Sequence, residues 1–139
     1  MTEPKFFFAT KAFIICNGKL LILRESPAYD AGTNSGKYDV AGGRIHPGER
    51  WDECLLREIK EETGLSVKIG KPFAVNEWRP VVKGEPWQIV GVFFECFADV
   101  DKIVMDSEHD EYQWIEPKEY KKHKIIDNLL PVFEAYLKK

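Results

Sequence analysis

Residues 42–65, GGRIHPGERWDECLLREIKEETGL, constrain this chain more than any other stretch. A glycine-rich turn is expected to lead into one short helix that ends at Gly64. The last two turns of that helix carry Glu58, Glu61 and Glu62, which fall within about a third of the helix circumference. Like charges at this spacing repel each other, and they lie at the negative end of the helix dipole. The arrangement therefore predicts a bound cation, and a hard divalent metal held by oxygen ligands is the simplest candidate.

The composition is that of a single globular domain. The chain has 139 residues, 44% of them hydrophobic and 31% charged, which is enough for one folded core over residues 1–139. Its net charge of −3 argues against a large basic surface for duplex nucleic acid, but it permits a small phosphorylated ligand.

Two features bear on the cellular compartment. Cys16, Cys54 and Cys96 have no CxxC spacing, and we interpret them as buried or incidental thiols in a reducing environment. The N-terminal stretch MTEPKFFFATK has an apolar run of three residues, too short for a signal or membrane segment. We therefore expect a cytoplasmic protein without a membrane partner.

Hydrophobic periodicity and turn residues divide the chain into strands, loops and helices. The expected strands are residues 6–16, 19–24, 37–41, 65–71, 73–78, 87–100 and 111–115. The expected loops and connections are residues 25–36, 79–86 and 101–110. The C-terminal part is expected to hold one helical turn over 117–121 and a helix over 125–137.

Some of these expectations are specific. Asn17-Gly18 predicts a tight hairpin, and the return strand, KLLILR, is expected to be buried on both faces. The strand over 87–100 is apolar on both alternating faces, which predicts a central position in a sheet. Pro131 lies within the helical pattern of the last segment and predicts a kink or a late start.

The helix of the opening stretch is expected to have a buried side as well as an acidic one. Leu55, Leu56 and Ile59 cover a face about 100° wide that borders the carboxylates. This side is expected to pack on a sheet while the acidic side stays open. Phe6 and Phe8 are interpreted as strand and core residues, as is the Phe7 between them, rather than as a platform for a base.

Read position by position, the opening stretch contains a nine-residue motif. Its members are Gly43, Glu49, Arg57, Glu58, Ile59, Glu61, Glu62, Gly64 and Leu65. Their spacing resembles the Nudix box, and residues 43–65 match every defined position of it. The residue before the glycine pair is often proline in this family and is Ala41 here, a departure outside the defining positions.

The resemblance to the MutT-like Nudix hydrolases extends beyond the box to the order of strands and helices. It implies an α/β (α+β) fold in which a mixed β-sheet is sandwiched between α-helices. It also implies an enzyme that cleaves a nucleoside diphosphate linked to another group, with Mg²⁺ as cofactor and Mn²⁺ as an alternative. Such chemistry needs charge neutralisation and in-line positioning more than covalent catalysis.

The same resemblance implies roles for the box residues. Glu58 and Glu62 are the expected direct metal ligands, and Glu61 is expected to share the metal or to bind it through water. The carbonyl of Gly42 is a further expected ligand. Arg57 is expected to orient the catalytic helix by pairing with the upstream glutamate, here Glu49.

A second acidic segment, SEHDEYQWIEP, covers residues 107–117. Similar Nudix proteins carry an acidic residue before the penultimate strand that binds metal or activates water. Glu111 is the first choice for this role and Glu108 the next, with a solvated acidic loop as the alternative. Asp110 is a candidate for contact with a purine edge. His109 is a candidate base, although a surface position is favoured in so polar a loop.

Substrate contacts are expected outside the box. Arg24 is a candidate for a phosphate contact, with a solvated strand edge as the alternative. Trp78, Arg79 and Trp87 flank a loop beside the expected cleft, where a tryptophan can stack on a base. Packing in the core or at the rim is the equal alternative for the tryptophans.

The expected reaction is hydrolysis of a (d)NTP to the monophosphate and pyrophosphate. Hydrolysis of ADP-ribose or a nucleotide sugar is the alternative within the family, and Pro80 gives a weak hint of it. A Nudix-like nucleotide-sensing domain without catalysis is a third reading, although such domains typically lose box carboxylates and this chain keeps them. A partner-binding module is a fourth. The expected partner is a small nucleotide, and the oligomeric state is expected to be a monomer or a homodimer.

Overall fold

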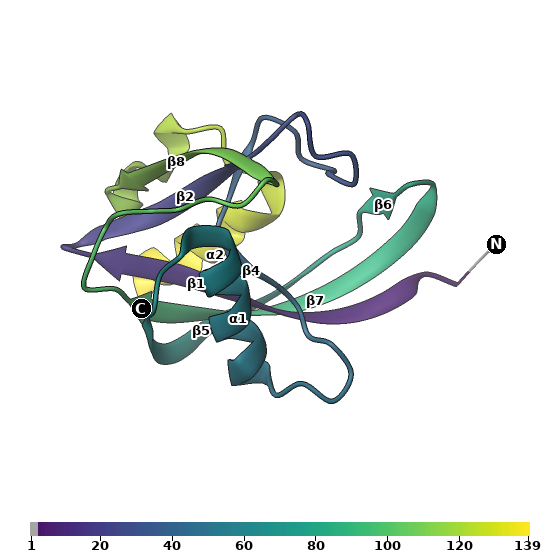
Figure 1. The fold of residues 1–139 in the computed structure, drawn as a ribbon, viewed down its shortest axis with the longest axis horizontal. Helices are drawn as coiled ribbons and strands as arrows, with labels where there is room; N and C mark the ends of the chain where they lie inside the picture. Colours follow the sequence, from purple (N-terminus) through teal and green to yellow (C-terminus); the bar gives the residue numbers. More distant parts are fainter. Residues whose placement is uncertain (1–2) are drawn as a thin grey trace.

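The computed structural model describes residues 3–139, which form a mixed sheet of eight strands with a helix on each side (Figure 1). The strands are β1 (Lys5–Cys16), β2 (Lys19–Glu25), β3 (Tyr38–Asp39), β4 (Ala41–Arg44), β5 (Lys68–Trp78), β6 (Val81–Val82), β7 (Glu85–Phe97) and β8 (His109–Ile115). The helices are α1 (Trp51–Thr63) and α2 (Leu130–Lys138), with short 3₁₀ helices at Pro117–Lys122 and Asp127–Leu129. This architecture confirms the expected fold class.

β1 organises the sheet. One of its edges pairs in parallel with β7 along almost its whole length. The other edge is shared, because β4 pairs with residues 9–12 and β2 pairs with residues 15–16. The chain crosses from β2 to β1 at Val40, where β3 ends and β4 begins. The sheet forks at this crossing.

The fork corrects two expectations. The single strand over 37–41 is divided into β3 and β4, and the glycine pair lies in β4 instead of in a turn. Gly42 lies opposite Lys11 and has a φ of 130°. A Cβ at Gly42 would lie 2.2 Å from the carbonyl oxygen of Thr10, so only glycine lets β4 approach β1 this closely.

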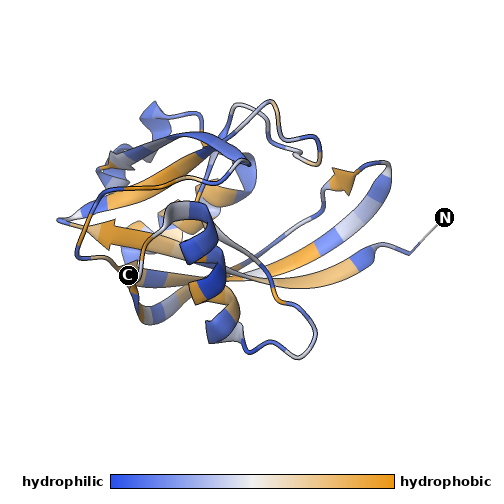
Figure 2. Ribbon diagram, viewed as in Figure 1, coloured by the Kyte–Doolittle hydropathy of each residue, from blue (hydrophilic) through white to orange (hydrophobic). Residues whose placement is uncertain are grey.

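The core has two layers because side chains alternate along β1. Ala12, Ile14 and Cys16 pack in the layer that contains Leu55 and Ile59 of α1. The layer on the other face contains Phe13 together with Leu129, Val132 and Phe133. Figure 2 shows the resulting pattern, with apolar strands at the centre and a hydrophilic outer side on α1.

Several specific expectations are confirmed. Asn17 and Gly18 both have positive φ, 51° and 77°, as the hairpin turn requires. β7 is central, between β1 and β5, and residues 20–23 of β2 are buried on both faces. α2 starts late, with Pro131 in its first turn. α1 ends before Gly64, whose φ is 76°.

Other expectations are wrong in detail. Residues 79–86 are not a loop: β6 and β7 form a hairpin there, because Lys83 and Gly84 adopt positive φ and make a tight turn. The two segments 65–71 and 73–78 form one strand, β5, whose pairing is irregular around Pro72. β8 starts at His109, two residues earlier than expected.

Some side chains are less buried than expected. Leu56 is 43% exposed, whereas Cys54 is fully buried. The buried side of α1 therefore includes Cys54 instead of Leu56, since α1 packs against the small residues of β4. Phe6 and Phe8 are about half exposed, because β1 and β7 extend beyond the part of the sheet that the helices cover (Figure 1).

The three cysteines are buried and unpaired, as expected. No helix within residues 3–139 has the length and hydropathy needed to cross a membrane.

Candidate active site

The box carboxylates line a cavity of about 520 Å³ at the fork of the sheet. β1, β3 and β4 contribute Lys11, Asp39 and the glycine pair to its wall, and α1 contributes Arg57, Glu58, Glu61 and Glu62. A smaller chamber of about 150 Å³ lies next to it and shares several of its residues, Glu62 among them. The sequence-predicted metal ligands of the box are therefore together in one place.

The three carboxylates differ in exposure. Glu62 is 9% exposed, and its Oε1 accepts a hydrogen bond from the backbone N–H of Gly42 (2.7 Å). Burial raises the pKa of Glu62 well above its usual range and also raises that of Glu58, since both charges are removed from water. Glu61 stands at the mouth, with 56% of its side chain exposed. A cation placed among these groups would offset the cost of burying their charge.

Gly43 makes room for Glu58. A Cβ at Gly43 would lie 1.9 Å from Oε1 of Glu58, so any other residue would occupy the space that the carboxylate now fills. β4 and α1 can meet at this point because the strand has no side chain there. This contact explains why glycine begins the motif.

The expected pair between Arg57 and Glu49 is present. Nε and Nη2 of Arg57 donate to the two carboxylate oxygens of Glu49 at 2.7 and 3.0 Å. The backbone N–H of His46 also donates to Glu49 (3.1 Å). These bonds lower the pKa of Glu49 to about 2, with the Arg57 bond as the largest cause. The pair ties the loop before α1 to the second turn of the helix, and Arg57 also reaches Glu61 (3.4 Å).

Lys11 is a functional candidate that the sequence reading missed. It is 7% exposed, and its Nζ lies 3.2 Å from Oδ2 of Asp39. Burial opposes its charge, but the charges of Asp39, Glu62 and Glu58 together outweigh burial and raise its pKa. The sequence feature that could have identified Lys11 is its position as a lone lysine before the apolar run AFIIC, in a segment expected to be a strand.

The connection between β7 and β8 brings another group to the site. Nδ1 of His109 lies 2.8 Å from Oδ1 of Asp106, and both side chains are mostly buried. One ligand atom from each of these residues and one from Glu62 lie within 4.8 Å of one another. The expected surface position of His109 is therefore wrong. The connection folds back because the N–H of Val104 donates to the carbonyl of Thr63 at the end of α1 (2.9 Å).

Glu108 lines both the cavity and the chamber, whereas Glu111 lines neither. Glu111 instead pairs with Nη1 of Arg24 (2.9 Å), and Asp110 pairs with Nε of the same guanidinium (2.8 Å). These three residues form a separate network outside the cavity and the chamber, and their predicted roles at the metal or the substrate stay predictions. The acidic residue that this segment brings to the site is Glu108, the second choice from the sequence.

The tryptophans lie where the sequence suggested. Trp78 and Trp87 both line the cavity. The guanidinium of Arg44 lies 4.6 Å from the ring centre of Trp87 and 4.5 Å from that of Phe7. Within residues 3–139, the indole Nε1 of Trp87 is buried without a hydrogen-bond partner. Arg44 thus offers a cation on this wall.

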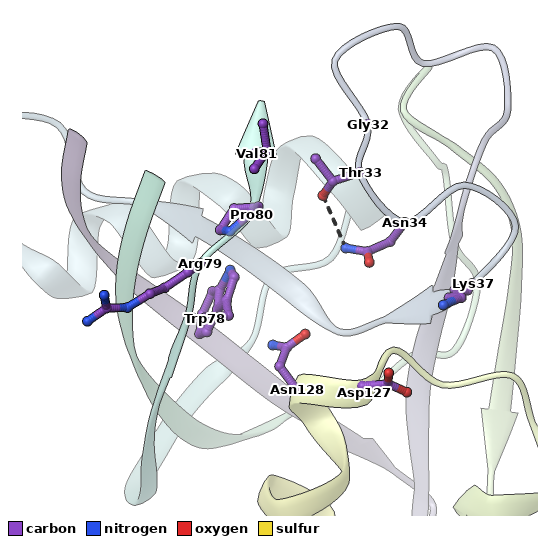
Figure 3. Close-up of a pocket in the computed structure, with 10 residues that line it drawn as sticks. All are labelled: Gly32, Thr33, Asn34, Lys37, Trp78, Arg79, Pro80, Val81, Asp127 and Asn128. Atoms are coloured by element: carbon purple, nitrogen blue, oxygen red, sulfur yellow. Dashed lines mark hydrogen bonds between the residues drawn. The ribbon is translucent and has the colours of Figure 1, made fainter. Parts of the chain in front are cut away.

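A second cleft, of about 450 Å³, adjoins the cavity through Trp78, which lines both (Figure 3). Asp127 and Asn128 lie below Trp78, and Thr33 and Asn34 stand on the loop opposite. The backbone carbonyl of Asn128 accepts from Nδ2 of Asn76 (2.6 Å), which ties this 3₁₀ helix to β5. Arg79 lines this second cleft instead of the first cavity, and it pairs with Glu77 (2.6 Å).

The donor set fits a divalent cation. Glu58, Glu61, Glu62 and Glu108 supply hard oxygen ligands around one cavity, and the buried members carry charges that burial disfavours. The space for the carboxylate of Glu58 depends on a glycine. The arrangement also supplies cations, Lys11 and Arg44, beside the space that a phosphate chain would occupy.

Comparisons with known proteins agree with this geometry. The family model described as the NUDIX domain matches residues 7–136. The nucleoside triphosphatase NudI of Escherichia coli K12 is 27% identical over 99 residues, which cover 66% of this chain and 70% of that protein. The CTP pyrophosphohydrolase of Escherichia coli K12 is 25% identical over 126 residues, covering 91% and 87%. The crystal structure of a MutT protein from Methanosarcina mazei Go1 has a TM-score of 0.87 at 24% identity, covering 99% and 97%.

Proposed function

The chain belongs to the Nudix family and is a hydrolase of phosphoric anhydride bonds, and from this premise we propose that it converts nucleoside triphosphates to monophosphates and pyrophosphate with Mg²⁺. The relatives named as a nucleoside triphosphatase and a CTP pyrophosphohydrolase support this substrate class. The observation that carries the proposal is that Trp78 lines both the carboxylate cavity and the second cleft. In this proposal the triphosphate occupies the first space and the base occupies the second.

Glu58 and Glu62 would hold the divalent cation, with Glu61 and Glu108 at its edges. The chemistry that this cation supplies is neutralisation of the phosphate charge and activation of the attacking water. The pair of Arg57 and Glu49 holds the loop against the helix, so that the carboxylates stay in place when substrate binds.

The protein's own cations act on the rest of the phosphate chain. The guanidinium of Arg44 lies over the rings of Phe7 and Trp87, and its N–H groups can donate to a phosphate oxygen. Lys11 is fixed by Asp39 at the inner wall, where it balances part of the carboxylate charge. Charges that are already in place need no reorganisation when charge develops on the leaving phosphate.

The second cleft suits a nucleobase. Trp78 offers an aromatic face for stacking, and Asp127 and Asn128 offer acceptors and donors for the edge of a base (Figure 3). We propose that these residues choose the base. Arg24, Asp110 and Glu111 have no part in this proposal, because they form a network elsewhere.

The test is a hydrolysis screen with product identification over the (d)NTPs, 8-oxo-dGTP, ADP-ribose, NADH and dinucleoside polyphosphates. We expect a nucleoside triphosphate to give the best turnover and to release pyrophosphate. Glu58→Gln should reduce that turnover by at least about 100-fold without unfolding the protein. The exposed Glu134 on α2 provides the matched control, Glu134→Gln, which should behave like the wild type.

Three results would contradict the proposal. If ADP-ribose is the best substrate, the proposed class of nucleoside triphosphates is wrong. Nucleotide binding without turnover of any compound would indicate a sensor. If Glu58→Gln turns over substrate at the wild-type rate, the proposed catalytic role of Glu58 is wrong.

A further inference from the structure

We propose that Asp106 and His109 join Glu62 in a metal site that contains a nitrogen ligand and favours a first-row transition cation over Mg²⁺. This inference rests on the proposed function, because Glu62 also belongs to the box. It adds a ligand type that the box does not contain. Of the chain's three histidines, only His109 belongs to this cluster of possible ligands.

The distances suit a shared ion. Nδ1 of His109 and Oδ1 of Asp106 are 2.8 Å apart, and one ligand atom of each residue lies within 4.8 Å of a carboxylate oxygen of Glu62. Adjacent ligands of an octahedral ion with bonds of about 2.1 Å stand about 3 Å apart. The His109–Asp106 spacing already matches this value.

The three ligands come from parts of the chain that are held together by backbone hydrogen bonds. The N–H of Val104 donates to the carbonyl of Thr63 next to Glu62 (2.9 Å), and the N–H of Ser26 donates to the carbonyl of Glu108 (2.8 Å). The connection is therefore fixed just before Asp106 and again just before His109. A ligand set that is already positioned loses little side-chain freedom when an ion binds.

The chamber beside these residues has the size and charge for an ion. Its volume is about 150 Å³, and it is lined by Glu62, His109 and Glu108, together with Glu25, Asp39 and Lys11. Since a water molecule takes about 30 Å³, this space admits a partly hydrated cation but not a nucleotide. Four carboxylates face one lysine here, so the chamber is negative. Glu62 is 9% exposed and has one hydrogen-bonded oxygen, which leaves its other oxygen for an ion.

The type of cation follows from the ligands. A site made only of carboxylates and water suits Mg²⁺, whereas an imidazole nitrogen raises the affinity for first-row transition ions, and more for Co²⁺ than for Mn²⁺. A histidine that binds a metal commonly hydrogen-bonds a carboxylate through its other nitrogen, and Asp106 is in position to act either as that partner or as a ligand. We therefore expect Mn²⁺ and Co²⁺ to bind with nitrogen coordination, and more tightly than Mg²⁺.

The test uses the full-length protein with Mn²⁺ alone and detects ligand nitrogen by electron spin-echo modulation. The wild type should show ¹⁴N modulation from an imidazole. His109→Gln should lose it and should bind Mn²⁺ about 10- to 100-fold more weakly. His123→Gln is the matched control outside the cluster, and His46→Gln tests the histidine that lines the neighbouring cavity. Both should keep the nitrogen signal.

The outcomes separate this inference from the proposed function. If Mn²⁺ binds without nitrogen modulation, the proposal of a nitrogen ligand is wrong, while the proposed metal site of the box carboxylates still stands. Loss of the signal in His46→Gln instead would overturn the assignment to His109. No Mn²⁺ binding at all would overturn both proposals. If His109→Gln does not fold, ¹⁵N-histidine labelling of a His46→Gln/His123→Gln protein gives the same answer, because His109 is then the only labelled residue.

Discussion

Gly43→Ala should separate the position of Glu58 from the stability of the fold. A Cβ at Gly43 lies 1.9 Å from Oε1 and 2.6 Å from the carboxyl carbon of Glu58. Ordinary contact begins near 3.4 Å, so the carboxylate has to retreat by about 1.5 Å. A displacement of about 1 Å at a catalytic group can cost about 100-fold in rate. We therefore expect turnover of the best nucleotide substrate to fall by about 100-fold or more.

The fold should tolerate the same change. The crowded atoms belong to the free end of a glutamate side chain, which can rotate away, and Gly43 does not have the positive φ that alanine would strain. Alanine also restricts the unfolded chain more than glycine does, which offsets part of any loss. The free energy of unfolding should therefore change by less than about 1 kcal/mol.

Gly18→Ala provides the opposite case. Gly18 has a φ of 77° and no atom within 4 Å of a Cβ, so alanine is strained there without touching the site. This variant should lose about 1–2 kcal/mol of stability and keep its turnover per folded molecule. The assays are steady-state turnover with saturating Mg²⁺ and urea denaturation of the same samples. Wild-type turnover in Gly43→Ala, or loss of turnover only in proportion to unfolded protein, would refute the argument.

Three further predictions concern the support of the site and the core. Arg57→Lys should lower turnover about 10- to 100-fold, because lysine cannot bond both oxygens of Glu49; wild-type kinetics would contradict this. The pKa of Glu49 is lowered to about 2, so its contribution to stability is complete above the ordinary value near 4.5 and is lost as the pH falls toward 2. Urea midpoints between pH 2 and 5 should therefore rise with pH less steeply in Glu49→Gln than in the wild type, and equal slopes would count against the pair. Phe133→Ala should lose about 3–5 kcal/mol in the same denaturation assay, because its ring is fully buried between Phe13 and Tyr120; a loss below about 1 kcal/mol would mean that the α2 layer adds little.

The box could be predicted from the sequence because its geometry is local. Glu58 and Glu62 stand one turn apart on a helix whose period is known, and Gly64 marks where that helix ends. Even the Arg57–Glu49 pair spans only eight residues. The relative positions of these box residues depend on backbone geometry over a few helical turns. The spacing of the residues in the sequence is enough to predict that geometry.

The parts that sequence reasoning missed depend on long-range pairing. Lys11 reaches Asp39 and the carboxylates only because β1 and β3 meet at the fork, 28 residues apart in sequence. The glycine pair reads as a turn in isolation, because glycine is typical of turns. Its reason is the approach of β4 to β1, where a Cβ on Gly42 would meet backbone atoms. Composition alone cannot show which strand passes beside a glycine.

The choice between Glu111 and Glu108 shows the same limit at its sharpest. β8 pairs with β2 so that Arg24 lies opposite Glu111 and Glu25 lies opposite His109, which leaves Asp110 as an extra residue in a bulge. Neighbouring residues on a strand point to opposite faces, so Glu25 and His109 line the chamber while Arg24 and Glu111 pair elsewhere. A shift of one residue in this pairing would exchange the two groups. The register of the sheet thus decides which acidic residue lines the site, and the letters SEHDEY do not carry that information.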